Sequence, residues 1–425
     1  MNAVLGTWTR IQSNSIFNST NGGYAGSIDI KSVTESKTFC PAPWTTLRLG
    51  TNGATGICPY SENVGNYLTD KVDDILKNSL INSVKTSMLN EEWHEHCNYC
   101  KNSEQHGGRS ERLLYIDNLN QKTKTYIGNN FDQNVLVSCS INWNNLCNLA
   151  CVYCNPDSSS EWQRVKGKIV EISRLDEENA VDYLITNQEH LKQITIGGGE
   201  PLLQKSIYKL LDNLHNEVFI HVTTNLSVKL ENNPMFNRII QNKNLKVNWM
   251  ISFDCLGDRF EYVRHGADWT VFCDNIDLLK KHNQKVTAHP AYCLYSAFDL
   301  VNYYDFCVDR NLELFWCDLF SPHELDIRFA PSSIRSKAIE EINQVLDKYN
   351  GNQNLAIETL HKYREMCYNG VPISKWVNHM EFSNQQRAKD ILSFIKSKEQ
   401  ELDKRTKFKE LWPNIFNELK ETCYE

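Results

Sequence analysis

The chain has 425 residues, of which 41% are hydrophobic and 11% aromatic, and its formal net charge is −7 at pH 7. This length is enough for a large core and more than one domain. The acidic balance excludes a bulk attraction to nucleic acid or an anionic membrane, and no stretch approaches the roughly 18 apolar residues of a membrane-spanning helix. The opening residues, MNAVLGTWTRIQ, lack the pattern of a secretory signal, so we expect a cytoplasmic protein.

Residues 1–35 are expected to form a flexible arm. Within them, SNSIFNSTNGGYAGS at residues 13–27 contains eleven Ser, Thr, Asn or Gly residues among fifteen. A stretch of this composition cannot bury enough apolar surface to order itself.

Residues 36–130 combine glycine, proline and cysteine with short apolar pieces, which predicts a loop-heavy region stabilised by a bound group. The chain has 15 cysteines, and in a reducing cytoplasm their clustering indicates metal binding rather than disulfides. Cys97 and Cys100 form a Cys-x2-Cys pair in WHEHCNYCKN. His94 and His96 flank this pair, and we expect them to be solvated rather than ligands.

Cys40 and Cys58 form a second pair upstream of the first. They lie in FCPAPWTTLRLGTNGATGICP, where Gly53 completes the pattern Cys-x12-Gly-x4-Cys. Asn52-Gly53 is a strong signal for a type I′ hairpin turn, and such a hairpin brings the two sulfurs close together. Two pairs make four thiolates, a set that serves zinc and iron–sulfur clusters alike.

From residue 131 to about 330, short runs of β-forming residues alternate with longer segments of helical pattern. This alternation predicts βαβ units and a parallel sheet. Six strands are too few for the usual closed barrel of eight, so we expect an α/β fold with a partial TIM-like (β/α)6 barrel whose site lies at the C-terminal ends of the strands. The predicted strands are NVLVSCSINW (134–143), KQITIGG (192–198), VFIHVTTN (218–225), KVNWMISFD (246–254), KVTAHPAYCL (285–294) and LELFWCDL (312–319).

Two helices are expected between these strands, in SSSEWQRVKGKIVEI (158–172) after a serine cap and in WTVFCDNIDLLKKH (269–282). Residues 331–425 follow a helical pattern throughout and are predicted to form a C-terminal helical appendage. Its first helix follows Pro331 behind a Ser332-Ser333 cap and carries one apolar stripe. The stripe consists of Ile334, Ala338, Ile339, Ile342, Val345 and Leu346.

The stretch WNNLCNLACVYCNP (143–156) gathers Cys147, Cys151 and Cys154 directly after the first predicted strand. A four-iron cluster is usually held by four thiolates, so three thiolates leave one iron free to bind another molecule. The spacing Cys-x3-Cys-x2-Cys, with Tyr153 before the last cysteine, resembles the signature of the radical S-adenosylmethionine (radical SAM) superfamily. For the three cysteines taken alone, a scattered zinc site or three buried thiols is the alternative.

The resemblance implies a [4Fe-4S] cluster whose open iron binds the amino and carboxylate groups of S-adenosylmethionine. One electron from this cluster cleaves the sulfonium to methionine and a 5′-deoxyadenosyl radical, which abstracts a hydrogen atom from the substrate. The cofactor supplies the chemistry, and the protein supplies position and excludes water. The implied electron source is a reductant such as flavodoxin or ferredoxin.

Polar residues at successive predicted strand ends resemble the cofactor pocket of this superfamily. IGGGEPLL (196–203) is similar to its Gly-Gly-Glu segment, which binds the methionine amino group, and glycines let the backbone approach a ligand closely. Ser252 and Asp254 alternate onto one face, as a ribose diol requires, and Arg264 resembles the arginine that pairs with the methionine carboxylate. The cofactor-binding residues implied in this way are Tyr153, Gly198, Gly199, Glu200, Pro201, Asn225, Ser252, Asp254 and Arg264.

The upstream cysteines resemble the twitch domain, a half-size relative of the SPASM domain that carries one auxiliary cluster in many peptide-modifying radical SAM enzymes. The order differs, because this module usually follows the barrel and here it precedes it. The resemblance implies an auxiliary [4Fe-4S] cluster, or a [2Fe-2S] cluster in its place, and favours iron–sulfur over zinc. The implied ligands are Cys40, Cys58, Cys97 and Cys100.

Cys317 and Asp318 end the sixth predicted strand. In a barrel of this kind, a hydrogen donor or proton acceptor at that place faces the substrate, so both are candidate catalytic residues on position alone. Cys255, next to Asp254, has a similar position. Most of the remaining cysteines are expected to be core residues.

The sequence therefore predicts a radical SAM oxidoreductase that modifies a peptide or protein side chain, with the auxiliary cluster binding substrate or transferring electrons. A radical SAM enzyme for a small sugar-like or nucleotide metabolite is the alternative among enzymes. From a different class, a non-catalytic iron–sulfur protein for electron transfer or redox sensing is a further alternative, although it has no use for a methionine and ribose pocket. Basic stretches do not coincide with aromatic residues, which argues against a nucleic-acid partner.

Overall fold

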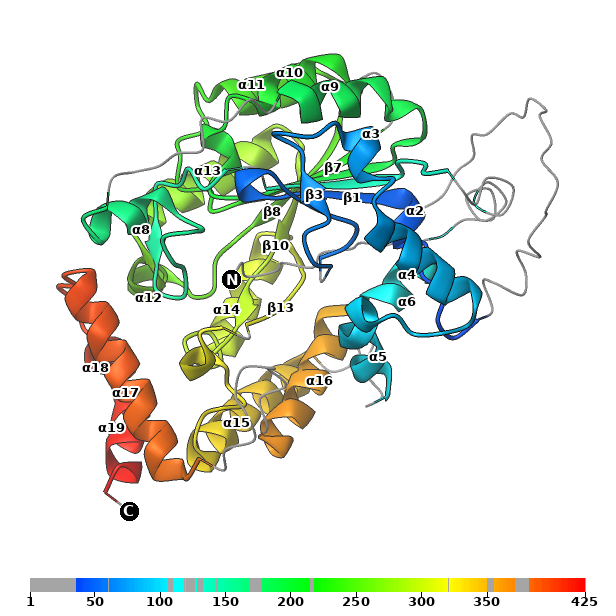
Figure 1. Cartoon of the computed structure of the whole chain (residues 1–425). Helices are drawn as coiled ribbons and strands as arrows, with labels where there is room; N and C mark the ends of the chain where they lie inside the picture. Colours follow the sequence, from blue (N-terminus) through cyan, green and yellow to red (C-terminus); the bar gives the residue numbers. More distant parts are fainter. Residues whose placement is uncertain are drawn as a thin grey trace.

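A computed structural model of the chain describes residues 36–424 except 60, 106–109, 118, 120–126, 128–132, 143, 169–177, 215–217, 320, 350–354 and 371–381. The arm predicted for residues 1–35 lies outside this part. A central sheet carries helices around its outer side, and a group of C-terminal helices lies below it in the view of Figure 1. The strand order of the sheet is β12-β10-β8-β7-β6-β4-β1-β2-β3.

Six of these strands are parallel neighbours that follow one another across the sheet in chain order. Helices connect them, which confirms the predicted partial barrel. The strands are β4 (Ser138–Ile141), β6 (Gln193–Ile196), β7 (Phe219–Thr224), β8 (Lys246–Ile251), β10 (Lys285–Ala288) and β12 (Glu313–Leu314). The helices are α8 (Ser160–Val165), α9 (Glu178–Thr186), α10 (Ile207–Asn213), α11 (Pro234–Gln241), α12 (Gly257–Val263), α13 (Trp269–Lys281) and α14 (Leu300–Asp309).

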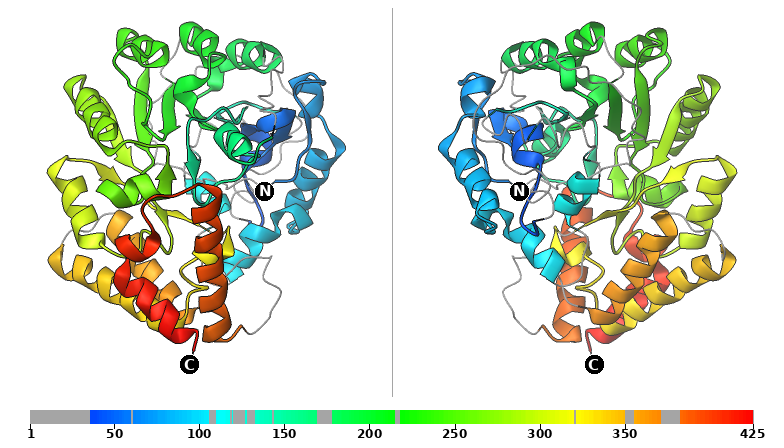
Figure 2. Two further views of the ribbon diagram at one scale, coloured as in Figure 1. Left: turned by 90° about the vertical axis from the view of Figure 1, so that its left-hand side faces the viewer. Right: turned by 90° about the vertical axis from the view of Figure 1, so that its right-hand side faces the viewer.

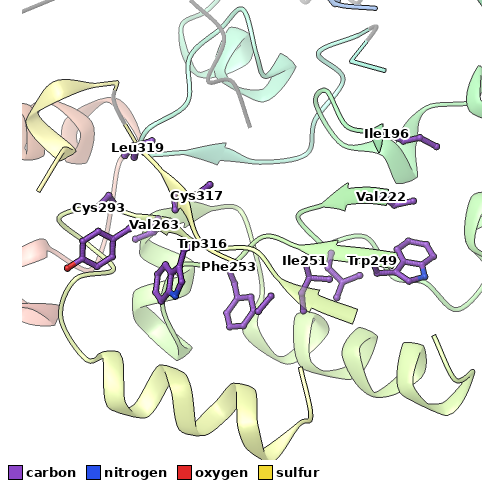
Figure 3. Close-up of a cluster of buried hydrophobic side chains, with 14 of the residues drawn as sticks. Ile196, Val222, Trp249, Ile251, Phe253, Val263, Cys293, Trp316, Cys317 and Leu319 are labelled. Carbon is purple, nitrogen blue, oxygen red and sulfur yellow. The ribbon is translucent and has the colours of Figure 1, made fainter. Parts of the chain in front are cut away.

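The two faces of the barrel strands differ in polarity because side chains alternate along a strand. On the outer face, Ile196, Val222 and Trp249 are buried against the helices, and the Trp249 ring lies 6.0 Å from the Phe236 ring on α11. Figure 3 draws Ile196, Val222 and Trp249 within one group of buried apolar side chains. The opposite face, which we call the concave face, is more polar. Its half-buried hydroxyl residues include Ser140, Thr195, Thr223 and Ser252.

The cysteine-rich region belongs to the same sheet as the barrel. β1 (Thr46–Leu49) pairs in parallel with β4, with Arg48 opposite Ser140, and the hydroxyl oxygens of Thr46 and Ser138 are 3.2 Å apart. The sheet therefore runs across the boundary that the sequence predicts at residue 130. Two views at right angles to Figure 1 show the N-terminal helices beside the barrel rather than apart from it (Figure 2).

A hairpin forms the edge of this extension, where β1 turns back into β2 (Ala54–Gly56) and β3 (Gly65–Asn66) follows. The φ angles are 57° at Asn52 and 81° at Gly53, the positive values that a type I′ turn requires. The predicted hairpin is thus confirmed. The helices of this region are α2 (Ala42–Thr45), α3 (Val72–Ile75), α4 (Ser79–Leu89), α5 (Asn98–Gln105) and α6 (Glu111–Asp117).

The C-terminal region is helical, as predicted. The stripe of its first helix is buried except for Leu346, which is half-buried against the core. This helix begins at Ser332 with Pro331 as its N-cap residue, and no side chain caps it, so the predicted serine cap is wrong. The helices are α15 (Ser332–Lys348), α16 (Leu355–Asn369), α17 (Asn384–Glu401), α18 (Phe408–Leu411) and α19 (Pro413–Thr422). Within the described ranges, no helix is long and apolar enough to cross a membrane.

Candidate active site

Three cysteine side chains lie near one another on the loop that leaves β4. Cys151 belongs to β5 (Ala150–Cys151), which pairs antiparallel with β9 (Arg264–His265) and places Cys151 opposite Arg264. Burial raises the pKa of the Cys154 thiol to about 12, and the charge of Cys151 adds to this rise. Burial also raises the pKa of Cys147, with contributions from the charges of Cys151 and Cys154. The three sulfurs are therefore close enough to interact.

The first turn of α8 holds this loop in place. The Cys147 N–H donates to Ser160 Oγ, and that hydroxyl donates to the Cys147 carbonyl, both at 3.0 Å. The buried Trp162 donates from Nε1 to the Cys151 carbonyl at 2.8 Å. Ser159 accepts from the Trp162 N–H at 3.3 Å, so the predicted serine cap of this helix is confirmed. The backbone of Cys147 and of Cys151 is thus hydrogen-bonded to the side chains of Ser160 and Trp162, which follow the loop in sequence.

The turn after β6 lies directly against the cysteine loop. The Gly199 N–H donates to the Asn144 carbonyl at 3.0 Å, and the Glu200 N–H donates to the Leu146 carbonyl at 2.7 Å. A Cβ atom on Gly199 would lie 2.3 Å from that Leu146 oxygen, and Gly198 has a φ of 103°. Glycine is therefore required at both positions, since any side chain would separate the two loops or strain the backbone.

Glu200 is fully buried beside these loops. Its Oε1 accepts from the Thr224 hydroxyl at 2.7 Å and from the Leu202 N–H at 3.0 Å, and its Oε2 accepts from the Asn225 N–H at 2.8 Å. Burial raises the pKa of the Glu200 carboxyl to about 7, although these hydrogen bonds oppose the rise. Asn225 also donates from Nδ2 to the Cys147 sulfur at 3.8 Å, which links the carboxylate to the thiol loop.

Two other predicted residues frame the same end of the sheet. Pro201 is buried and begins the short helix η4 (Pro201–Leu203). Ser252 is half-buried just beyond β8 on the concave face, and its N–H donates to the Thr224 carbonyl at 2.8 Å. The end of β8 therefore brings a hydroxyl group to the strand ends where Glu200 also lies.

Asp254 is the centre of a buried network that the sequence did not predict. Its Oδ2 accepts from the Tyr153 hydroxyl at 2.9 Å and pairs with Arg264 at 3.0 Å, and its Oδ1 accepts from the Ala291 N–H at 2.9 Å. The Arg264 guanidinium lies 5.7 Å from the centre of the Tyr153 ring. Burial lowers the pKa of Arg264, but Asp254 and other negative groups outweigh burial and raise it. In this structure the protein itself thus occupies the Asp254 oxygens predicted to bind ribose.

One buried donor of Arg264 remains unmatched after this pair has formed. Its Nε is buried and, among the described residues, has no hydrogen-bond partner. A buried donor without an acceptor is costly, and a ligand carboxylate bound here would remove that cost. The residues present therefore fit the predicted cofactors in two respects, a glycine backbone cradle against the cysteine loop and an unmatched cationic donor opposite Cys151.

The two candidate catalytic residues lie in β13 (Cys317–Asp318), which pairs with β11 (Ala291–Tyr292). Cys317 is buried, its thiol donates to the Pro290 carbonyl at 3.4 Å, and burial followed by the charge of Asp254 raises its pKa. Asp318 pairs with Lys362 of α16 at 3.1 Å. Asp318 is therefore tied to the C-terminal region, and a catalytic role for either residue stays a prediction.

Lys404, in the segment after α17, is a residue near the site that sequence reasoning missed. It is buried, and its Nζ donates to the Tyr262 carbonyl and approaches His265 Nδ1 at 3.2 Å. His265 lies opposite Ala150 in the β5–β9 pair. Burial lowers the pKa of Lys404 to about 8, and the charge of Cys151 opposes that shift. No local signal in the sequence relates this lysine to a loop some 250 residues away.

The four upstream cysteines share one cavity. Cys40, Cys58, Cys97 and Cys100 all line it, together with aromatic and charged side chains such as Tyr115. Burial raises the pKa of Cys40, and the charges of the other three cysteines add to the rise. The structure therefore brings this predicted set together. Over the described ranges, no three His, Cys, Asp or Glu side chains are placed to hold a single metal ion.

His94 and His96, which precede Cys97 and Cys100, lie in different surroundings. His96 lines the cavity, while His94 Nε2 lies 3.2 Å from the Ser83 hydroxyl. The two imidazole rings stack with centroids 5.1 Å apart. His96 Nδ1 lies 3.6 Å from Glu62; the His96 side chain is only 12% exposed, whereas that of Glu62 is 76% exposed.

A family model described as the radical SAM superfamily matches residues 141–296. Among curated proteins, the chain is similar to 7-carboxy-7-deazaguanine synthase of Clostridium acetobutylicum, with 35% identity over 88 residues that cover 20% of this chain and 36% of that enzyme. It is also similar to GTP 3′,8-cyclase of Campylobacter lari, with 32% identity over 85 residues that cover 19% of this chain and 25% of that enzyme. The chain thus matches only about a third and a quarter of the lengths of these relatives.

Solved structures align with parts of the chain. Native anSMEcpe with bound AdoMet aligns with a TM-score of 0.38 and 18% identity, over 50% of this chain and 60% of that chain. Streptococcus suis SuiB bound to S-adenosylmethionine aligns with a TM-score of 0.37 and 14% identity, over 69% of this chain and 68% of that chain.

Proposed function

We propose that this chain, whose residues 141–296 form a radical SAM domain, is an enzyme that reductively cleaves S-adenosylmethionine and removes a hydrogen atom from a substrate. The observation that carries the proposal is the contact between the cysteine loop and the Gly198–Glu200 turn, which joins three thiols to a glycine cradle and a buried carboxylate. Members of this superfamily use a [4Fe-4S] cluster and S-adenosylmethionine. An electron carrier has no use for the glycine cradle and the buried carboxylate.

Each residue has a separate task in the proposal. Cys147, Cys151 and Cys154 hold the cluster, which when bound supplies the electron that cleaves S-adenosylmethionine to methionine and the radical that attacks the substrate. Glu200 accepts a hydrogen bond from the methionine ammonium, and Arg264 Nε donates to its carboxylate. The described geometry supports these tasks because both side chains are buried close to the cysteine loop.

Ser252 is the half-buried hydroxyl that we propose for the ribose. We propose that Asp254 does not contact the ribose. Its bonds to Tyr153 and Arg264 hold those two side chains in position. The predicted ribose pair thus becomes one contacting residue and one positioning residue.

The four upstream cysteines are proposed to hold an auxiliary [4Fe-4S] or [2Fe-2S] cluster in a twitch-like region that assists substrate binding or electron transfer. Their common cavity supports this, as does β1, which fastens the region to the barrel edge. Because the twitch domain that this region resembles occurs in many peptide-modifying radical SAM enzymes, we propose a peptide or protein side chain as the substrate. A reductant such as flavodoxin or ferredoxin would supply the electrons.

A small nucleotide-like substrate is the second candidate. The names of the two curated relatives, a deazaguanine synthase and a GTP cyclase, favour it. Each match covers only about a fifth of this chain. The likeness therefore supports shared cofactor chemistry more than a shared substrate.

The central test is formation of 5′-deoxyadenosine from S-adenosylmethionine by the anaerobically reconstituted, reduced protein. We expect this product even without substrate, and more of it with the right one. Deuterium-labelled peptides and nucleotides would then identify the substrate class by transfer of the label into 5′-deoxyadenosine. Full iron loading without any product would contradict the proposal and favour an electron carrier or redox sensor.

The affinity for S-adenosylmethionine should depend on pH through Glu200. Its pKa of about 7 means that the carboxylate is ionised above neutral pH and protonated below it. Only the ionised form attracts an ammonium group, so we expect the affinity to fall about tenfold for each pH unit below 7. Calorimetric titration between pH 5.5 and 8.5 measures the effect.

Glu200→Gln is the matched variant for this titration, since it keeps the shape and removes the ionisable group. The variant should bind S-adenosylmethionine weakly at every pH, without the rise toward pH 8. An unchanged pH dependence in the variant would show that another group is responsible.

Lys404 should influence the reduction potential of the radical SAM cluster. A buried positive charge near Cys151 stabilises the more negative, reduced state. Lys404→Met should therefore lower the midpoint potential by on the order of 50 mV, a one-electron shift close to tenfold in the reduction equilibrium. Redox titration followed by electron paramagnetic resonance measures this potential.

Lys396→Met is the control, because Lys396 is an exposed lysine of α17 and its loss should leave the potential unchanged. Lys404→Arg should keep most of the wild-type value. Equal potentials in the wild type and in Lys404→Met would refute an electrostatic role for Lys404.

A further inference from the structure

Arg48 lies on the strand that joins the cysteine-rich hairpin to the barrel. It lies in β1 and stands opposite Ser140 of β4 on one side and opposite Gly56 of β2 on the other. Ser140 in turn stands opposite Thr195 of β6. Directly paired residues share a face of a sheet, so Arg48 projects from the same concave face as these two hydroxyl residues of the barrel.

The Arg48 side chain lies across Gly56. A Cβ atom on Gly56 would come within 2.8 Å of Arg48 Nε and within 2.9 Å of one of its terminal nitrogens. Glycine at this position therefore leaves room for the guanidinium close to the sheet. Ser61, which lines the cysteine cavity, is also next to Gly56, with its Oγ 2.6 Å from the same Cβ position.

Among the residues that the structure describes, no carboxylate supplies the Arg48 guanidinium with a counter-charge. The guanidinium is half-buried, and burial lowers its pKa. Its Nε is buried without a hydrogen-bond partner, and no Asp or Glu of the described residues pairs with it. Buried arginines normally bind a carboxylate because an unpaired charge is costly to bury. The buried ion pairs of Arg112, Arg264 and Arg328 follow that rule, and Arg48 does not.

The groups that act on Arg48 belong to the cysteine region. The charges of Cys58 and Tyr115 both oppose the fall in its pKa, and both residues line the cysteine cavity. Arg48 does not itself line that cavity, but it shares Gly56 as a neighbour with Ser61, which does. The strand face that carries Arg48 continues into the barrel through Ser140 and Thr195. A ligand group bound at Arg48 would therefore lie on the face that runs from the cysteine-rich hairpin into the barrel.

We propose that Arg48 binds an oxyanion of the substrate, either a carboxylate or a phosphate. The planar fork of an arginine matches both groups with two parallel hydrogen bonds. Binding supplies the missing counter-charge and a partner for Nε. The proposal rests on the function proposed above and narrows its substrate class to anionic molecules, either a peptide with an acidic side chain or free C-terminus or a phosphorylated metabolite.

Isothermal titration of the reconstituted protein with two probes tests the proposal. Glutarate represents the carboxylate source and pyrophosphate the phosphate source, and the tighter probe identifies the anion. The variants are Arg48→Gln, which removes the charge, and Arg48→Lys, which keeps the charge but loses the planar fork. Arg405→Gln removes one exposed positive charge elsewhere and serves as the matched control.

We expect at least one probe to bind the wild type and the control equally, with at least tenfold weaker binding to Arg48→Gln and an intermediate affinity for Arg48→Lys. Equal affinities for the wild type and Arg48→Gln overturn the proposal. A changed auxiliary-cluster potential with unchanged anion affinity also overturns it, because Arg48 would then be the counter-charge of that cluster. If Arg48→Gln does not fold, an unchanged affinity in Arg48→Lys overturns it instead.

Formation of 5′-deoxyadenosine without substrate separates this inference from the proposed function. Arg48 belongs neither to the three-cysteine loop nor to the residues proposed to bind S-adenosylmethionine, so Arg48→Gln should retain this activity at the wild-type level. No product from the wild type would mean that the proposed function fails. A wild type that forms the product but binds both probes no better than Arg48→Gln would leave the function intact and remove Arg48 from substrate binding.

Discussion

Replacing Cys151 by Ala is expected to abolish the formation of 5′-deoxyadenosine from S-adenosylmethionine. Cys151 is one of only three thiols on the loop against the Gly198–Glu200 turn, and a cubane held by two thiolates has no stable coordination there. The loss should appear both in product analysis by liquid chromatography and as about four fewer irons per chain after reconstitution, the content of one [4Fe-4S] cluster.

Cys97→Ala is the matched variant, since it removes a thiol from the separate cavity that holds the upstream cysteines. It should lose the auxiliary iron, keep cleavage of S-adenosylmethionine without substrate, and lose turnover of the true substrate. Equal loss of cleavage in Cys97→Ala and Cys151→Ala would contradict separate roles for the two sites.

Asp254→Asn should lower the free energy of unfolding by about 3–5 kcal/mol, the usual cost of removing one partner of a buried ion pair. The side chains of Asp254 and Arg264 are 0% and 8% exposed, and they lie 3.0 Å apart. The substitution leaves the Arg264 charge buried without its carboxylate. Thermal and denaturant unfolding of the metal-free protein, compared with the wild type, measures the loss.

Tyr153→Phe provides the comparison for this variant. It removes one hydrogen bond to Asp254 and leaves the ion pair, so it should cost only about 1 kcal/mol. An Asp254→Asn protein as stable as the wild type would mean that water or a neighbouring group compensates Arg264. Such a result would contradict the positioning role proposed for Asp254.

The barrel and the cysteine loop were predictable because their signals are local. Each parallel strand has an apolar outer face buried by helices, so runs such as QITI and FIHVTT are visible as strands without knowledge of their partners. The three cysteines lie within eight positions of one another. The turn at Asn52 and Gly53 was visible for the same reason, since positive φ angles restrict the residue types that fit.

Features that depend on distant partners were not predictable. Nothing in the residues of β1 shows that it pairs with β4 of the barrel in addition to β2 of its own region. Asp254 was predicted to face the ribose because its alternation with Ser252 is visible, whereas the bond to Arg264 depends on how β9 folds back against β5. Lys404 reaches the site only because the C-terminal segment packs against Tyr262 and His265.

The union of β1 with β4 bears on how the chain is assembled during synthesis. Thr46 and Ser138, which face each other across this pair, are 92 residues apart. β1 therefore leaves the ribosome well before β4. Until β4 is made, one backbone edge of β1 is unpaired and can pair with another chain, which favours aggregation. The strand that joins the upstream cysteine region to the barrel therefore gains its parallel partner only after β4 has been synthesised.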